Sequence, residues 1–174
     1  MWKYNGKVIR EGSSWANSNG IQHPPNWYIW SKSEKEAAGM TEVNPETPPD
    51  SRLYTWNYAA DGVTIEKTAK NLADTTVDGV TNEGVKTILK REVQAQQYRK
   101  LAETDWVVVR KADKGTAIPS NIQTYRDAIR TKATAMESAI DGAANTAAVS
   151  ALFVTFDSEG NKSGILYDWP ELGS

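Results

Sequence analysis

A proline-rich stretch of seven residues constrains this chain more than any other feature. Residues 44–50 read Asn-Pro-Glu-Thr-Pro-Pro-Asp, and three prolines in seven residues prevent helix formation and stiffen the backbone. The patterns before this stretch favour β-strands, whereas the helical patterns lie well after it. A length of 174 residues suits one ordinary domain or two small ones. Residues 44–50 are therefore predicted to be a linker.

Aromatic residues and a tight-turn signal characterise the part before the linker, residues 1–43. Four of the seven tryptophans fall within the first thirty residues. Asn5-Gly6 separates two short runs of strand-forming residues, and both positions readily adopt the positive φ that a type I′ hairpin turn requires. We predict a β-rich module here, with strands at 2–4, 7–10 and 27–30 and a loop over 14–25.

Helix signals and a second hairpin flank the linker. Ser31 and Glu34 have the spacing of a capping box, and Gly39 is placed to end the short helix that this box opens. After the linker, 51–80 is predicted to form a β-hairpin. Its strands span 52–58 and 63–67, around a turn at Ala60-Asp61-Gly62.

The C-terminal part, residues 81–174, is predicted to be a helical hairpin with a short β tail. Two apolar stripes recur at helical spacing, and a break at 114–116 separates them. The first stripe consists of Val85, Ile88, Leu89, Val93 and Leu101, and the second of Ile122, Tyr125, Ile129, Ala133, Met136 and Ile140. We expect the two helices to pack antiparallel within one chain, although the stripes would also suit a seam between copies.

Shorter segments complete the C-terminal part. Residues 106–109 are compatible with either a strand or a helix. Residues 146–151 suit one short helix, and a hairpin is expected between 153–156 and 165–167. The fold class is therefore α+β, with an aromatic-rich β-hairpin module, a Pro-rich linker and an antiparallel helical hairpin with a short β tail.

Composition argues against an enzyme. The chain has no cysteine, which excludes disulfides, thiolate catalysis and zinc–thiolate sites. Its only histidine, His23, lies beside prolines in a predicted loop, a poor context for a metal ligand or a catalytic triad. Phosphate-binding glycine patterns are missing. No catalytic, cofactor-binding or metal-binding residues are therefore predicted, and no cofactor is expected.

Charge and hydropathy limit the classes of partner. The net charge is −2, and Lys and Arg are dispersed among acids, so nucleic acid is not an expected partner. No apolar run approaches the ~20 residues that a membrane helix needs, so no membrane insertion is expected.

The sequence therefore predicts function through protein surfaces. Aromatic residues bury a large area with little loss of side-chain entropy, which suits interface centres as well as small cores. Stacking of exposed tryptophans on sugar rings is a further hypothesis. The candidate interface residues are Trp27, Trp30, Trp56, Trp106, Tyr125, Arg126 and Trp169.

Two groups of motifs resemble proteins of tailed bacteriophages. Glu103-Thr104-Asp105-Trp106, followed by Ile118-Pro119, Tyr125-Arg126 and Ile129-Arg130, resembles the C-terminal part of tail fibre assembly proteins. The N-terminal part, with Asn5-Gly6 and the run from Gly20 to Trp27, is similar to small proteins encoded beside tail fibre genes.

The resemblance implies a phage tail protein that binds the fibre, baseplate or tail tube. We expect a structural component of the virion tail, made in the cytoplasm of the host bacterium and acting as an adaptor or decoration. The alternatives are a fibre assembly chaperone absent from the mature particle and a module that binds host glycans. Family members tend to end soon after the last helix, whereas residues 153–169 add a β-like tail here.

Overall fold

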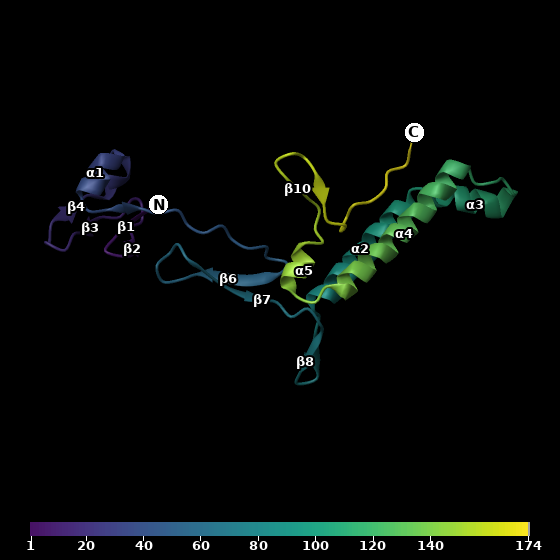
Figure 1. Cartoon of the computed structure of the whole chain (residues 1–174), viewed down its shortest axis with the longest axis horizontal. Helices are drawn as coiled ribbons and strands as arrows, with labels where there is room; N and C mark the ends of the chain where they lie inside the picture. Colours follow the sequence, from purple (N-terminus) through teal and green to yellow (C-terminus); the bar gives the residue numbers. More distant parts are fainter. Residues whose placement is uncertain (174) are drawn as a thin grey trace. The chain divides into compact units, whose positions relative to one another are not determined.

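The computed structural model describes residues 1–173 and consists of two compact units. The first unit is Met1–Thr68 and the second begins at Ala69. The chain is of the mixed α+β class, 39% helical and 19% strand, with small antiparallel hairpins. The expected class is thus confirmed, and Figure 1 shows the elements along the chain.

The Pro-rich residues 44–50 belong to the first unit, whereas the sequence had indicated a separating linker there. The Glu46 amide donates a hydrogen bond to the Val63 carbonyl (2.9 Å), and the Glu46 carboxylate accepts one from the Ile65 amide (2.6 Å). These two bonds attach the extended stretch to the hairpin that follows. The division falls instead at Thr68/Ala69, within the predicted segment 51–80.

The first unit contains a three-stranded antiparallel sheet of order β2-β1-β5. Its strands are β1 (Trp2–Tyr4), β2 (Lys7–Val8) and β5 (Thr41–Glu42). Asn5 and Gly6 have φ values of 47° and 77°, as the predicted type I′ turn requires, and Tyr4 pairs with Lys7 across it.

Two predictions between residues 14 and 30 are wrong. The expected loop contains a short hairpin of β3 (Trp15–Ala16) and β4 (Gln22–His23), because the Asn17 side chain accepts hydrogen bonds from two amides of the intervening turn. The expected strand at 27–30 is part of a 3₁₀ helix, η1 (Pro25–Ile29). Pro25 begins that helix, where a proline loses no hydrogen bond.

The capping box and the second hairpin are confirmed. Ser31 and Glu34 exchange side-chain and backbone hydrogen bonds at the start of α1 (Lys32–Ala37), and Gly39 follows its end with φ 82°. The second hairpin pairs β6 (Tyr54–Tyr58) with β7 (Ile65–Ala69). The Asp61 carboxylate accepts bonds from the Val63 and Thr64 amides in its turn, which holds the pKa of that carboxyl well below its usual value.

A third hairpin, not predicted from the sequence, precedes the helices of the second unit. It pairs β8 (Thr75–Val77) with β9 (Val80–Asn82). Asp78-Gly79, with φ values of 51° and 79°, is the type I′ signal that would have identified it.

Two long antiparallel helices form the core of the second unit (Figure 1). The unit contains α2 (Val85–Ala102), α3 (Asp105–Lys114), α4 (Ser120–Gly142) and α5 (Thr146–Ser150). Lys86 near the start of α2 bonds to the Asp141 carbonyl near the end of α4, and Gln94 bonds to Glu137. The buried residues of the pair are Val85, Leu89, Val93, Tyr125, Arg126, Ile129, Ala133, Met136 and Ile140. The two stripes pack against each other within the chain, and residues 106–109 are helical.

The segment before α2 satisfies amides at the start of that helix. The Val85 and Lys86 amides donate to the carbonyls of Asn71 and Leu72, and the Gly84 amide donates to the Asp74 carboxylate (2.7 Å). Helix starts leave such donors unpaired within the helix itself. Gly84 is required by space, since a Cβ there would lie 2.3 Å from the Ala73 carbonyl carbon.

The C-terminal residues cross both long helices. After the hairpin of β10 (Thr155–Phe156) and β11 (Lys162–Ser163), residues 165–170, here called the C-terminal strap, return over α2 and α4. Leu166 is fully buried. Asp168 pairs with Lys132 of α4 (2.9 Å), whereas the Trp169 indole donates to Gln96 of α2 (2.7 Å). The strap therefore joins the two helices from outside.

Replacing Gly84 with Ala should destabilise the second unit. The added methyl group collides with the Ala73 backbone, and overpacking of this kind costs about 1–3 kcal/mol in free energy of unfolding. Gly142→Ala is the matched control, because nothing lies within 4 Å of a Cβ at that position. Urea unfolding followed by circular dichroism measures both. Equal stability of the two variants would contradict the packing at Gly84.

The C-terminal strap should loosen in acid. Hydrogen bonds from Lys162 and Lys132 hold the pKa of the Asp168 carboxyl below its ordinary value. A depressed folded-state pKa stabilises the fold above the unfolded pKa of about 4, and the contribution is lost as the pH falls through the folded value. Wild type should thus lose more free energy of unfolding between about pH 6 and about pH 3 than Asp168→Asn. Urea titrations at the two pH values test this, and equal losses would contradict it.

Candidate protein-binding surface on helix α3

The seven candidate residues differ widely in exposure. Trp27, Tyr125 and Arg126 are buried, at 1%, 6% and 6% exposure, so they are core residues of the isolated chain and not exposed contacts. Trp30, Trp56 and Trp169 are half-buried. Trp106 alone of the seven is exposed, at 57%.

The buried and half-buried candidates have structural partners. The Trp27 indole donates to the Ser13 carbonyl (3.0 Å) inside the first unit. The Trp30 ring lies edge-on to His23, at a centroid distance of 5.6 Å. The Trp56 ring lies edge-on to Tyr58, at 5.5 Å. These contacts stabilise their units locally.

Arg126 closes the corner between α2 and α3. From α4, its guanidinium donates to the Leu101 carbonyl (2.8 Å), to the Thr104 hydroxyl (2.7 Å) and to the Asp105 carboxylate (2.9 Å). Thr104 is itself 4% exposed. A buried guanidinium is stable only when its donors are paired, and here three partners from the corner supply that pairing. The corner therefore has one defined geometry.

Tyr125 packs beside this clamp. Burial raises the pKa of its hydroxyl, and the negative charge of Glu103 adds to the shift. The motif residues Thr104, Asp105, Tyr125 and Arg126 thus build the corner.

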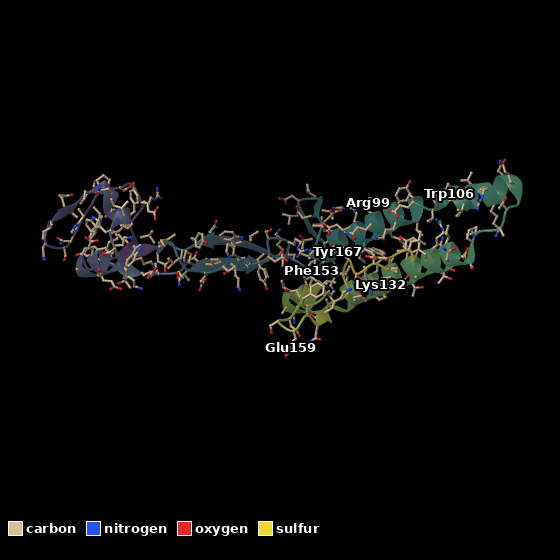
Figure 2. All side chains as sticks on the ribbon, turned by 90° about the horizontal axis from the view of Figure 1, so that it is seen from above. Arg99, Trp106, Lys132, Phe153, Glu159 and Tyr167 are labelled. Carbon is tan, nitrogen blue, oxygen red and sulfur yellow. The ribbon has the colours of Figure 1, made fainter. Side chains whose placement is uncertain are left out.

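The same corner presents Trp106 outward at the start of α3. Val107 is fully buried and anchors the helix, while Val108 and Val109 are 39% and 65% exposed. The Arg110 guanidinium lies 4.9 Å from the centroid of the Trp106 ring, within the range of a cation–π contact. Trp106, Val109 and Arg110 are here called the α3 surface. Figure 2 labels Trp106 on this helix, and Figure 1 shows α3 at the opposite end of the helical pair from α5.

The sequence stretch that contains α3 is basic, although the whole chain is acidic. Residues 99–114 contain five basic residues, namely Arg99, Lys100, Arg110, Lys111 and Lys114. The acids in the same stretch are Glu103, Asp105 and Asp113, so the net charge is five minus three, or +2, against −2 for the chain. Asp105 is already paired with Arg126. Exposed apolar residues in a stretch of net positive charge favour an acidic protein partner.

Val109 and Arg110 were missed by the sequence analysis. The run Val107-Val108-Val109 suits a strand as well as a helix. The i, i+3, i+4 spacing of Trp106, Val109 and Arg110 places them on one face only if the segment is helical, and the structure shows that it is.

Residues 1–173 contain no cluster of three or more His, Asp or Glu side chains that could hold a metal ion. His23 stacks on Trp15, at a centroid distance of 4.2 Å, and lies edge-on to Trp30. Within the described residues, none of the helices has the length and apolar character to cross a membrane.

Comparisons with protein-family models, curated proteins and solved structures find no match.

Removing the Arg126 guanidinium should weaken the corner. Arg126→Met keeps most of the apolar stem but removes the guanidinium bonds to the Leu101 carbonyl, the Thr104 hydroxyl and the Asp105 carboxylate, which costs about 1–3 kcal/mol in free energy of unfolding. Arg130→Met is the control, because Arg130 is exposed and pairs with Asp127 on the same helix, a contact worth less than about 0.5 kcal/mol. Urea unfolding of the two variants should differ accordingly, and similar values would show that the clamp adds little.

Proposed function

We propose that this chain is a structural component of a bacteriophage tail that binds a neighbouring tail protein through the α3 surface. One observation carries the proposal. Thr104, Asp105 and Arg126, which belong to the motifs that resemble tail fibre assembly proteins, are joined at one corner, and the exposed Trp106 follows directly after Asp105. Trp and Arg are the residues most enriched at the energetic centres of protein interfaces.

Rigidity of the α3 surface supports a binding role. Val107 anchors α3 in the core, and Arg110 lies within the range of a cation–π contact with the Trp106 indole. A side chain that is already ordered loses less entropy when a partner binds, so more of the contact energy appears as affinity. Fibre, baseplate and tail-tube proteins are the candidate partners, and self-association through the same surface is the homo-oligomeric form of the proposal.

The proposal is tested on particles of the phage that encodes the chain. Phages carrying wild type or Trp106→Ala are purified, and the chain is quantified by mass spectrometry. Wild type should be present at a fixed copy number per particle. Loss of a central tryptophan weakens an interface by about 2 kcal/mol or more, or roughly thirtyfold, so Trp106→Ala should be depleted from particles.

Tyr28→Ala is the matched control, since Tyr28 is an exposed aromatic residue (46%) of the first unit. This variant should be incorporated like wild type. Absence of the wild-type chain from particles, with abundance in the infected-cell lysate, would refute a structural role and favour the assembly chaperone. Normal incorporation of Trp106→Ala would refute the α3 surface as the docking site.

A further inference from the structure

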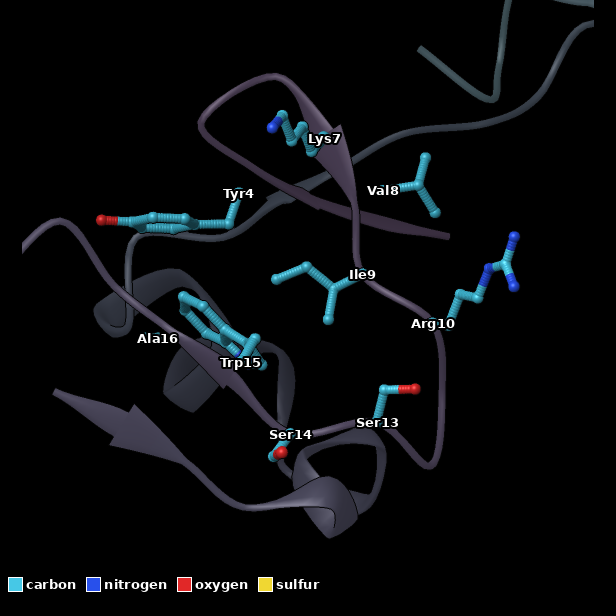
Figure 3. A pocket seen from close by; sticks show the side chains of 9 residues that line it. All are labelled: Tyr4, Lys7, Val8, Ile9, Arg10, Ser13, Ser14, Trp15 and Ala16. Carbon is cyan, nitrogen blue, oxygen red and sulfur yellow. The ribbon is translucent and has the colours of Figure 1, made fainter. Parts of the chain in front are cut away.

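Two neighbouring pockets lie in the first unit, on either side of the residues that follow β2. The first, of about 370 Å³, is lined by Tyr4, Lys7, Ile9, Arg10, Ser13 and Trp15 among others. In Figure 3, Tyr4 and Trp15 lie on one side of Ile9, whereas Arg10 lies on its other side. The second pocket, of about 450 Å³, includes Trp2 and the acidic Glu11 and shares Val8, Ile9 and Arg10 with the first. Arg10 therefore stands where the two pockets adjoin.

The cations of the first pocket are available to a ligand. Lys7 and Arg10 are exposed, and neither has an ion-pair or hydrogen-bond partner for its side chain within residues 1–173. No acid lines this pocket, although the first unit as a whole carries one more acid than base. Other lysines of the unit are paired, such as Lys3 with Asp61 and Lys32 with Glu42. Two unpaired cations at one cavity favour an anionic ligand.

The aromatic residues that line the first pocket, Tyr4 and Trp15, have contacts to other residues of the unit that hold them in place. The Tyr4 and Trp15 rings are half-buried and lie 4.6 Å apart, between centroids, at an angle of 43°. The Tyr4 hydroxyl is hydrogen-bonded to Ser18, and Trp15 stacks on His23. Fixed rings bind a ligand with little loss of their own entropy. The part of each ring that remains exposed supplies an apolar wall.

We propose that these pockets bind an acidic oligosaccharide, with one sugar residue in each pocket and Arg10 contacting the acid groups between them. A sugar acid offers C–H faces for Tyr4 and Trp15, hydroxyls for Ser13 and Ser14, and a carboxylate for Lys7 or Arg10. A single amino-acid side chain of a peptide combines at most two of these features. The pockets reach the size at which small ligands are held, about 300–1,000 Å³.

Calorimetric titration of the full chain tests the proposal. The acidic probes are tetragalacturonate and tetrasialic acid, and maltotetraose is the neutral probe. At least one acidic probe should bind roughly tenfold or more tightly than maltotetraose, because charge-assisted hydrogen bonds to Lys7 and Arg10 are added. Added salt should weaken that binding. The double variant Lys7→Gln, Arg10→Gln should lose the preference, and it should fold normally because both side chains are exposed.

Lys67→Gln is the control for loss of a positive charge elsewhere in the first unit, since Lys67 is exposed on β7 and lines neither pocket. It should retain the preference, as should Trp106→Ala, so a failure here is distinguishable from a failure of the α3 surface. Three outcomes would overturn the proposal: no binding of either acidic probe, unchanged preference in the Lys7/Arg10 double variant, or equally tight binding of tetraglutamate, which would indicate an acidic-peptide site.

Discussion

The apolar seam between α2 and α4 is the contact on which the second unit depends. Leu89 and Val93 from one helix and Ile129 and Met136 from the other are removed from water along its length. Neither helix has another partner of comparable size, so burial of these stripes fixes their antiparallel register. At one end of the helical pair, the Arg126 guanidinium binds the corner between α2 and α3. At the other end, the segment before α2 accepts hydrogen bonds from the first amides of that helix. Residues 165–170 contact both helices of this pair.

The first unit is stabilised in a different way. Its strands have two to five residues, and few side chains are fully buried. Strands of this length have little stability alone, so tight turns, side-chain hydrogen bonds and aromatic contacts define the fold. Tyr4, Trp15, His23 and Trp30 form a row of ring contacts, with Trp27 buried nearby in sequence. Tyr4 and Trp15 of this row remain half-buried and line the first pocket.

One motif of the second unit contains both packing residues and an exposed residue. Thr104, Asp105, Tyr125 and Arg126 lie in the corner, and their role is architectural. Trp106 lies next to them in sequence and is directed outward, because successive helical residues point about 100° apart. The packing residues of this motif thus position the exposed Trp106 beside them. The phage-tail proposal rests on this combination, and the saccharide proposal rests on a separate unit of the chain.

The sequence by itself determined the local features of this protein. The Asn5-Gly6 turn, the capping box of Ser31 and Glu34 and the two helical stripes follow from backbone preferences and periodicity within a few residues. Only the tertiary structure decided which aromatic residues are exposed. Trp27 and Trp106 both occur in short apolar runs, yet Trp27 is enclosed and Trp106 is not. Burial depends on which distant segments meet, and no local pattern specifies that for a tryptophan. The unpaired cations beside Tyr4 and Trp15 were hidden from the sequence for the same reason.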